Sequence, residues 1–368
     1  MGKINIGIIG MNFGKEFIKI YQTHPDVGTV AICQRDEKSL HAIGDALGIP
    51  ETLRFTDADR ILAVENIDAI HVVTPPMSHA ALSVKALNAG KHAACTIPMG
   101  LSIEELQSIV DASDANGKNY MMMETAVYTR EFLFVKNLVD SGQLGRIQFV
   151  RGSHIQDMGL EGWPEYWLGF PPFWNGTHAI SPLITINEKP AEFVVGHGSG
   201  HLSEALAARY GSPFAVETVT IKLADSDVVA EATRSLYEVV RQYRESFDVY
   251  GTKMAFEWEQ IADEKPALFE GGEDARRIDI PDTDDLLIEP LKSFTRREEI
   301  LDKENVSFIQ GAGHGGSHPH LVQEFIGSIV ENRPPRLDAR KAANITAAGI
   351  CGHESSMKGG ERVYLPKF

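Results

Sequence analysis

The first fourteen residues constrain the fold most, because they change from strand character to helix character across a glycine turn. A β-branched run over residues 4–9 ends at Gly10, as expected of a buried parallel strand. From Phe13 onward the apolar residues recur at helical spacing. A strand, a tight turn and a helix N-terminus together gather free N–H groups and the positive end of a helix dipole, which suits a pyrophosphate.

The glycine turn is shorter than the G-x-G-x-x-G fingerprint of dinucleotide-binding proteins. It reads Gly10-Met11-Asn12-Phe13-Gly14, with Asn12 where the second glycine would stand. Asparagine tolerates a positive φ, so the turn can still form. An ordinary strand-to-helix loop is the alternative interpretation, and the following elements decide between the two.

The next hundred residues alternate between strands and helices. A second strand over 27–33 ends in Gln34-Arg35-Asp36, about 20 residues past the turn, where a ribose-binding acid is expected. Further strands are predicted at 67–74, 91–96 and 120–123, and helices at 37–47, 57–64, 79–89 and 102–117. This alternation predicts a doubly wound parallel sheet in an α/β domain over residues 1–125.

Beyond residue 125 the pattern changes to strands joined by short polar turns. A helix at 131–141 precedes strands near 146–156, 191–197, 214–224, 228–240, 245–251 and 253–259. We expect a second α/β domain over 126–368 with an open, mostly antiparallel sheet. Residues 262–316 are acidic, glycine-rich and poorly patterned. Two helices at 319–331 and 338–357 follow, the second expected to pack back on the first domain, and a short strand lies at 362–365.

Composition excludes several classes of function. The formal net charge of −16 argues against a nucleic-acid partner, because phosphates would be repelled. No apolar run approaches the roughly 20 residues of a membrane span, and the N-terminus lacks a basic-then-apolar signal. Cys33, Cys95 and Cys351 are an odd number without a C-x-x-C pair, which favours reduced, buried thiols and a cytoplasmic protein.

Several short motifs have the order and spacing of one family. They are Val73-Thr74-Pro75-Pro76 with His79, Gly90-Lys91-His92 leading to Pro98, and Gly142-Gln143-Leu144-Gly145-Arg146-Ile147. With the N-terminal turn, these stretches make the chain resemble the Gfo/Idh/MocA oxidoreductases, named for glucose–fructose oxidoreductase and inositol dehydrogenase. The resemblance covers nearly the whole chain and is weakest over 262–316.

The resemblance implies a Rossmann domain that binds NAD or NADP, followed by an α/β domain for substrate and oligomerisation. It also implies a sugar or cyclitol substrate and a homo-oligomer, a dimer or tetramer, formed through the open face of the sheet. The residues expected around the cofactor are Gly10, Asn12, Phe13, Gly14, Gln34, Arg35, Thr74, Pro75, His79, Thr96 and Pro98.

The cofactor preference leans slightly towards NADP. Gln34 would not repel a 2′-phosphate, and Arg35 could pair with one or stack on adenine. A shift of register would instead place Asp36 at the ribose, as in an NAD enzyme.

Two departures from the family alter its proton-handling residues. The family's catalytic E-K-P motif reads Thr96-Ile97-Pro98 here, and Ile97 can neither move a proton nor donate a hydrogen bond. The family's D-x-G-x-H-x-x-D motif aligns with residues 174–181, where Trp174 and Ser181 replace both acids and His178 remains. His178 is therefore the leading candidate base, because imidazole titrates near neutral pH.

Other candidates lie near predicted strand ends and in the aromatic stretch. Tyr128 is a second catalytic candidate, and Arg130 is either a substrate contact or a structural ion-pair partner. Trp163, Trp167 and Trp174 could stack on the apolar faces of a sugar; the alternatives are a loop packed by its own aromatics or a subunit contact. His154, His314 and His318 are further substrate-contact candidates. His318 could assemble a metal site with His154 and His178, but no two of these three have the helical spacing H-x-x-x-H, so no metal site is predicted.

Three functions remain open on the sequence. The first is an NAD(P)-dependent oxidoreductase acting on a hydroxyl or keto carbon of a sugar, glycoside or cyclitol. The second is a redox-neutral enzyme with tightly held NAD, in which transient oxidation acidifies a neighbouring C–H and elimination cleaves a glycoside. The third is a catalytically silent nucleotide-binding sensor, favoured by the replacements at Ile97, Trp174 and Ser181.

Overall fold

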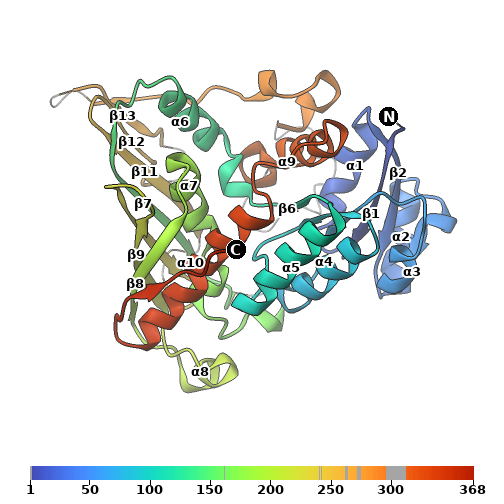
Figure 1. Cartoon of the computed structure of the whole chain (residues 1–368), viewed down its shortest axis with the longest axis horizontal. Coiled ribbons are helices and arrows are strands. Elements are labelled where there is room, and N and C mark those ends of the chain that lie inside the picture. The colour runs from blue at the N-terminus through green and yellow to red at the C-terminus, as the bar shows by residue number, and fades with distance from the viewer. Residues whose placement is uncertain are drawn as a thin grey trace. The chain divides into compact units, whose positions relative to one another are not determined.

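The computed structural model describes residues 2–160, 162–239, 241, 243–261, 264–271, 275–295 and 312–368. The chain forms two compact units, whose elements are labelled in Figure 1. The first unit contains Met1–Thr129, Asp282–Ala343 and Phe368, and the second contains Arg130–Pro281 and Asn344–Lys367. From the sequence alone, residues 282–343 were expected in the second domain. Within the segment 262–281, Ala267–Phe269 and Ala275–Arg277 form strands of the second unit.

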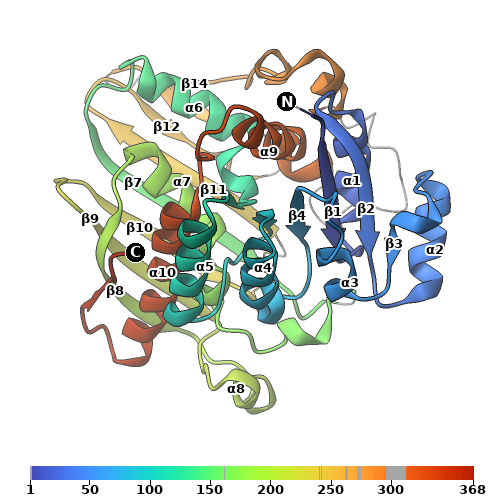
Figure 2. The ribbon, with the colours of Figure 1, turned by 45° about the vertical axis from the view of Figure 1, so that its right-hand side comes forward.

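A parallel sheet forms the centre of the first unit, as predicted, and it has six strands rather than the five expected. Its strand order is β3-β2-β1-β4-β5-β6, so β1 lies between β2 and β4 (Figure 2). The strands are β1 (Ile4–Ile9), β2 (Val27–Cys33), β3 (Arg54–Phe55), β4 (Ala69–Val72), β5 (His92–Cys95) and β6 (Tyr120–Met122). The sequence analysis missed β3, which has two residues and pairs only with β2 within the described part of the chain.

Helices follow most of these strands. Ser102 caps the helix that follows β5: its hydroxyl accepts from the N–H of Glu105, whose carboxylate accepts from the N–H of Leu101. The helices of this unit are α1 (Lys15–Thr23), α2 (Glu37–Ala46), α3 (Ala58–Leu62), α4 (His79–Asn88), α5 (Ile103–Asn116) and α9 (Ala312–Val330). Short 3₁₀ segments are η1 (Glu51–Leu53), η2 (Pro76–Ser78), η3 (Thr125–Val127), η6 (Asp284–Leu286) and η7 (Glu289–Thr295).

The turn between β1 and α1 is closed by two backbone contacts that exclude side chains. Gly10 has a φ of 99°, and a Cβ there would lie 2.2 Å from the carbonyl oxygen of Val73. A Cβ on Gly14 would lie 2.1 Å from the carbonyl oxygen of Gly10. The ends of β1 and β4 therefore approach each other closely, and α1 begins directly against the turn.

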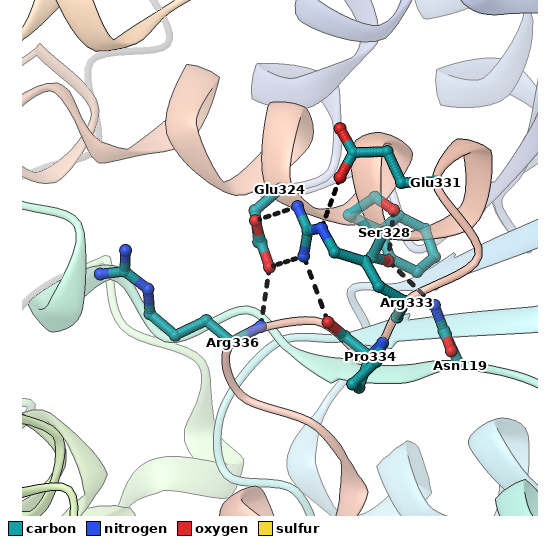
Figure 3. Close-up of polar contacts among 8 residues, drawn as sticks. Asn119, Glu324, Ser328, Glu331, Arg333, Pro334 and Arg336 are labelled. Atoms are coloured by element: carbon teal, nitrogen blue, oxygen red, sulfur yellow. Dashed lines mark hydrogen bonds and ion pairs between the residues drawn. The ribbon is translucent and has the colours of Figure 1, made fainter.

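The segment after α9 covers the edge of the sheet at β6. The N–H of Met122 donates to the carbonyl of Leu337 at 3.1 Å, and the side-chain amide of Asn119 donates to the carbonyl of Arg333 at 2.8 Å. Figure 3 shows the Arg333 guanidinium facing Glu324, with two nitrogen–oxygen distances of 2.8 and 2.9 Å. This bidentate pair fixes the chain where it leaves α9 and so protects the sheet edge.

The second unit is built on a nine-stranded sheet, mostly antiparallel as predicted. Its order is β14-β13-β12-β11-β7-β10-β9-β8-β15, and β7 and β10 run parallel. The strands are β7 (Ile147–Gln156), β8 (Ala191–Ser199), β9 (Val216–Leu223), β10 (Val229–Ser235), β11 (Tyr243–Gly251), β12 (Ala255–Glu257), β13 (Ala267–Phe269), β14 (Ala275–Arg277) and β15 (Val363–Tyr364).

Helix α7 lies directly on the central strands of this sheet (Figure 1). A Cβ on Gly152 of β7 would lie 2.2 Å from the carbonyl oxygen of Ala179 in α7, so the glycine permits the close approach. The helices are α6 (Arg130–Asp140), α7 (Thr177–Asn187) and α8 (Glu204–Tyr210), with 3₁₀ segments η4 (Glu165–Trp167) and η5 (Pro172–Asn175). Helix α10 (Ala339–Met357) begins in the first unit and continues in the second from Asn344.

From the sequence alone, we expected no membrane-spanning helix and three reduced, buried cysteines. Across the described ranges, no helix combines the length and apolar character needed to cross a membrane. The three cysteines are buried and free, as predicted. Burial raises the pKa of Cys33 to about 11 and that of Cys95 and Cys351 to about 12, so these thiols are poor nucleophiles at neutral pH.

The glycine turn yields a prediction about stability. Gly14 has a φ of −59°, which alanine adopts without strain, so Gly14→Ala tests the steric contact alone. We expect a loss of about 1–3 kcal/mol in the free energy of unfolding, measured by urea denaturation, because the new methyl overpacks the turn. Gly327→Ala in α9, whose Cβ would have its nearest neighbour at 3.6 Å, is the control. Equal stability of the two variants would contradict the close contact.

A second prediction concerns the ion pair at the end of α9. Arg333→Ala should lower the free energy of unfolding by about 1–3 kcal/mol, because it removes charge-assisted hydrogen bonds to a largely buried Glu324. Arg340→Ala removes an arginine paired with Asp114, where both side chains are more than half exposed. We expect that control to change stability by about 0.5 kcal/mol or less in the same thermal or urea measurement. A larger loss of unfolding free energy in Arg340→Ala than in Arg333→Ala would contradict this prediction.

Candidate functional site

The nucleotide-binding features of the first unit gather at the carboxyl end of β1. Strands β2 and β4 lie on either side of β1. The carboxyl ends of such neighbouring strands are where doubly wound sheets bind ligands. Among the described residues, no backbone carbonyl accepts a hydrogen bond from the N–H groups of Asn12, Phe13 or Gly14. These donors lie at the N-terminus of α1, so the turn fits the pyrophosphate of a dinucleotide.

The end of β2 contacts this turn. The Gln34 side-chain oxygen accepts a hydrogen bond from the N–H of Met11 at 3.3 Å. Arg35 is exposed beside it. Asp36 begins α2, and its carboxylate accepts from the N–H of Lys38 at 3.2 Å. The acid next to the expected ribose position is thus used as a helix cap, while Gln34 points to the turn.

His79 joins the loops that follow β4 and β5. Its Nδ1 lies 2.7 Å from the carbonyl oxygen of Pro98, and its Nε2 lies 2.6 Å from that of Thr74. The ring is 1% exposed, and burial lowers its pKa although both carbonyls oppose that shift. The Thr96 hydroxyl lies 3.5 Å from the same Nε2. His79 therefore holds together the loops that carry Thr74, Thr96 and Pro98.

The start of α9 brings two predicted histidines to the glycine turn. The Phe13 ring contacts His314 and His318 edge-on, with centroid distances of 5.7 and 5.5 Å. His314 Nδ1 and His318 Nε2 are 3.2 Å apart. The sequence analysis expected the helix to begin at Pro319, whereas α9 begins at Ala312. His314, Gly315 and Gly316 have positive φ, so the first residues of this helix contain a glycine-rich turn.

The polar cluster of the second unit surrounds His178. Its Nδ1 lies 3.8 Å from a carboxylate oxygen of Glu245, whose other oxygen accepts from the Tyr243 hydroxyl at 2.7 Å. The ring of His154 lies 4.8 Å from that of His178 and 5.3 Å from that of Tyr243, between centroids. Strand register explains the grouping, because Glu245 on β11 is paired with His154 on β7.

Buried polar atoms near His178 in sequence lack partners within the described residues. They are the side-chain oxygens of Asn175, Thr177 and Ser181, each on a residue at most 2% exposed. An unsatisfied buried hydrogen-bonding atom is costly and needs an explanation. Ligand hydroxyls or water would satisfy such atoms, so this stretch has the donors and acceptors that a polyhydroxyl compound needs.

The aromatic stretch is largely packed against itself. Phe170 contacts Trp167, Trp174 and Tyr210 edge-on, with centroids 5.2 to 5.5 Å apart. Trp167 is 9% exposed, whereas Trp163 and Trp174 are partly exposed. The Trp174 ring also meets His353, which pairs with buried Glu217 at 2.7 Å. Trp167 thus packs in the core, and the other two retain accessible surface.

Tyr128 and Arg130 fall on opposite sides of the unit division. The Tyr128 hydroxyl is buried, has no hydrogen-bond partner in the described structure, and lies under Arg336, which stands 5.4 Å over the ring. Burial and the Glu324 charge raise the pKa of this phenol well above its usual value. It is therefore a weak candidate for proton acceptance at neutral pH. Arg130 begins α6.

Sequence reasoning missed several members of these clusters. Glu16, in the first turn of α1, has a carboxylate oxygen 3.4 Å from His318 Nδ1. Glu245 and Tyr243 are on β11, and their period-2 spacing could have marked one face of the strand. No group of three metal-ligating side chains is found among the residues described.

Comparisons with known proteins agree with this architecture. The model of the Gfo/Idh/MocA oxidoreductase family with an NAD-binding Rossmann fold matches residues 4–124. A levoglucosan dehydrogenase in complex with NADH aligns over all of both chains, with a TM-score of 0.80 and 18% identity. Myo-inositol 2-dehydrogenase from Lactobacillus plantarum aligns over 99% of this chain and 100% of its own, with a TM-score of 0.75 and 18% identity.

A relative found by sequence similarity is named as a glycosyl hydrolase rather than as a dehydrogenase. A glycosyl hydrolase family 109 protein of Porphyromonas gingivalis is 28% identical over 197 residues, which are 51% of this chain and 42% of that protein. The match thus spans less than half of the relative's own length. The family model thus matches the Rossmann domain, and the likeness to these solved structures shows the same fold over the whole chain.

Proposed function

We propose that the protein is an NAD(P)-dependent oxidoreductase acting on a hydroxyl or keto carbon of a sugar, glycoside or cyclitol. The observation that carries the proposal is the polar chain Tyr243–Glu245–His178 in a protein whose first domain matches an NAD-binding oxidoreductase family. Such chemistry needs a proton acceptor with a group beside it that favours one tautomer, and here the Glu245 carboxylate faces His178 at 3.8 Å.

His178 moves the substrate proton in this proposal. The carboxylate of Glu245 faces Nδ1, which favours a proton on that nitrogen and leaves Nε2 as the acceptor for a substrate hydroxyl. Tyr243 donates to Glu245 and so holds the carboxylate in place. When bound, the nicotinamide supplies the hydride acceptor or donor. The turn residues Asn12, Phe13 and Gly14 would hold its pyrophosphate through their N–H groups.

The substrate class follows from the neighbouring side chains. The buried oxygens of Asn175, Thr177 and Ser181 would pair with substrate hydroxyls, directly or through water. The accessible faces of Trp163 and Trp174 would stack on the apolar C–H face of a sugar ring. His154 and Arg130 remain candidate substrate contacts.

A redox-neutral, glycoside-cleaving enzyme is the second candidate function. It is favoured by the relatives named as glycosyl hydrolase family 109 proteins and by Ile97, which replaces the family's lysine. Here His178 would take a proton from carbon rather than from a hydroxyl, and the cofactor would show no net change. Product analysis with an aryl glycoside, in parallel with NAD(P)H absorbance on a panel of sugars, separates the two candidates.

The cofactor preference is proposed to favour NADP slightly. Gln34 adds no negative charge near the ribose, Arg35 is exposed beside it, and Asp36 is used as the cap of α2.

Gln34→Asp should shift the preference towards NAD by about tenfold in the ratio of the two dissociation constants, because its carboxylate would repel a 2′-phosphate. Calorimetric titration with both cofactors measures this ratio. Gln22→Asp, in the last turn of α1, is the charge control and should leave the ratio unchanged. An unchanged ratio in Gln34→Asp would remove this residue from cofactor selection.

The role of His178 is tested by His178→Asn. This variant should retain cofactor affinity but lose about 10²-fold or more in kcat, the scale of general-base catalysis. His201→Asn, an exposed histidine of the same unit, should retain both. Near-normal turnover by a folded His178→Asn protein would contradict the assignment and show that another group accepts the proton.

A further inference from the structure

The second unit contains a glutamate–histidine pair that the proposed reaction does not use. Glu217 on β9 is fully buried, and one of its carboxylate oxygens lies 2.7 Å from Nδ1 of His353 in α10. Its other carboxylate oxygen accepts a hydrogen bond from the N–H of Phe173 in η5 at 3.0 Å. Because each oxygen has a partner from a different element, the carboxylate is fixed in place and holds the imidazole in one orientation.

Strand register places this pair in one row with the polar cluster around His178. Glu217 on β9 is paired with Arg234 on β10, which is paired in turn with His154 on β7. His154 is then paired with Glu245 on β11. Side chains directly opposite one another on neighbouring strands lie on the same face of a sheet. The row therefore ends in a carboxylate on each side, and each carboxylate faces an imidazole from a helix packed on the sheet.

The pairing with Glu217 sets the tautomer of His353. A carboxylate only accepts hydrogen bonds, so the proton of this imidazole lies on Nδ1 and Nε2 is left as an acceptor. Within the described part of the chain Nε2 has no hydrogen-bond partner, and the side chain is 12% exposed. The imidazole is thus oriented on one side and accessible to a ligand on the other.

The surroundings of His353 suit a carbohydrate. Its ring meets the ring of Trp174 edge-on, with centroids 5.9 Å apart, and Trp174 is also partly exposed. The next residues along the chain include Asn175 and Thr177, whose buried side-chain oxygens have no partner among the residues described. An aromatic ring beside several hydrogen-bonding atoms is the combination that a sugar ring needs, because a sugar has both apolar C–H faces and hydroxyls.

We propose that His353 is a second substrate-contacting residue, whose Nε2 accepts a hydrogen bond from a hydroxyl other than the one on which His178 acts. Glu217 is its positioning residue. The inference rests on the proposed function, because it takes the substrate to be a polyhydroxyl compound. Two imidazoles, each held by a carboxylate at one end of the same row, contact two hydroxyls of one substrate and so select among stereoisomers.

Steady-state kinetics with glucose, its epimers mannose and galactose, and the cyclitol inositol test this role. His353→Asn places an amide N–H where Nδ1–H stands, so Glu217 keeps its partner while the acceptor at Nε2 is removed. KM for the sugar that wild type prefers should rise about tenfold, the equivalent of one hydrogen bond, with kcat changed by about twofold or less. The preference among these sugars should weaken. His201→Asn, which alters an exposed histidine of the same unit, should keep both constants.

Nitrogen-15 spectra of the histidines in the substrate-free protein test the orienting role of Glu217. In wild type the proton of His353 should lie on Nδ1. In Glu217→Gln the amide oxygen stays with the N–H of Phe173, so the amide NH₂ donates to Nδ1 and the imidazole proton moves to Nε2. A proton on Nε2 in wild type would overturn the proposed orientation.

The kinetic outcomes separate this inference from the proposed function. An unchanged KM and an unchanged sugar preference in a folded His353→Asn protein would overturn the inference alone, because wild-type turnover would still support the proposed function. A lower thermal midpoint with these kinetic constants unchanged would likewise assign the pair to packing. Absence of turnover of these sugars and of an aryl glycoside by wild type would overturn the proposed function and this inference together.

Discussion

The close approach of the β1 turn to the end of β4 is the constraint on which the nucleotide half of the protein depends. No side chain fits at Gly10, because the carbonyl of Val73 occupies its place, and none fits at Gly14, because the carbonyl of Gly10 does. The chain therefore passes from strand to helix with its N–H groups uncovered. The ring of Phe13 then becomes the surface against which His314 and His318 pack, so residues 300 positions apart reach one place.

The polar cluster of the second unit depends on a different constraint, strand register. Pairing of β7 with β11 puts Glu245 opposite His154, and the lack of a side chain at Gly152 lets α7 lie close enough to bring His178 to the same face. A slip of one residue would turn Glu245 to the other side of the sheet. The candidate base and its carboxylate are thus held by backbone pairing rather than by a local motif.

Sequence reasoning recovered the elements whose signals are local and missed those that depend on distant partners. Apolar runs and glycine stops located the main strands of both sheets, whereas β3 was too short to give a pattern. Residues 282–343 were expected in the second domain but group with the first unit, where Arg333 and Leu337 accept hydrogen bonds from Asn119 and Met122 at the edge of the Rossmann sheet. His178 was found from a motif. Glu16 and Glu245 were not found, since their importance arises from contacts across the fold.

The buried imidazoles of the first unit also make it sensitive to acid. Burial lowers the pKa of His71 and His318 to about 3 and that of His92 to about 4, while the same rings in an unfolded chain titrate near 6.5. Between these pKa values the unfolded chain binds protons that the folded chain does not bind. The free energy of unfolding therefore decreases as the pH falls below about 6.5. Glu16 acts in the opposite sense, because its pKa is raised and it takes up a proton on folding between pH 4.5 and about 8. Three histidines are affected in this way against one glutamate. The first unit is consequently more stable at neutral than at acidic pH.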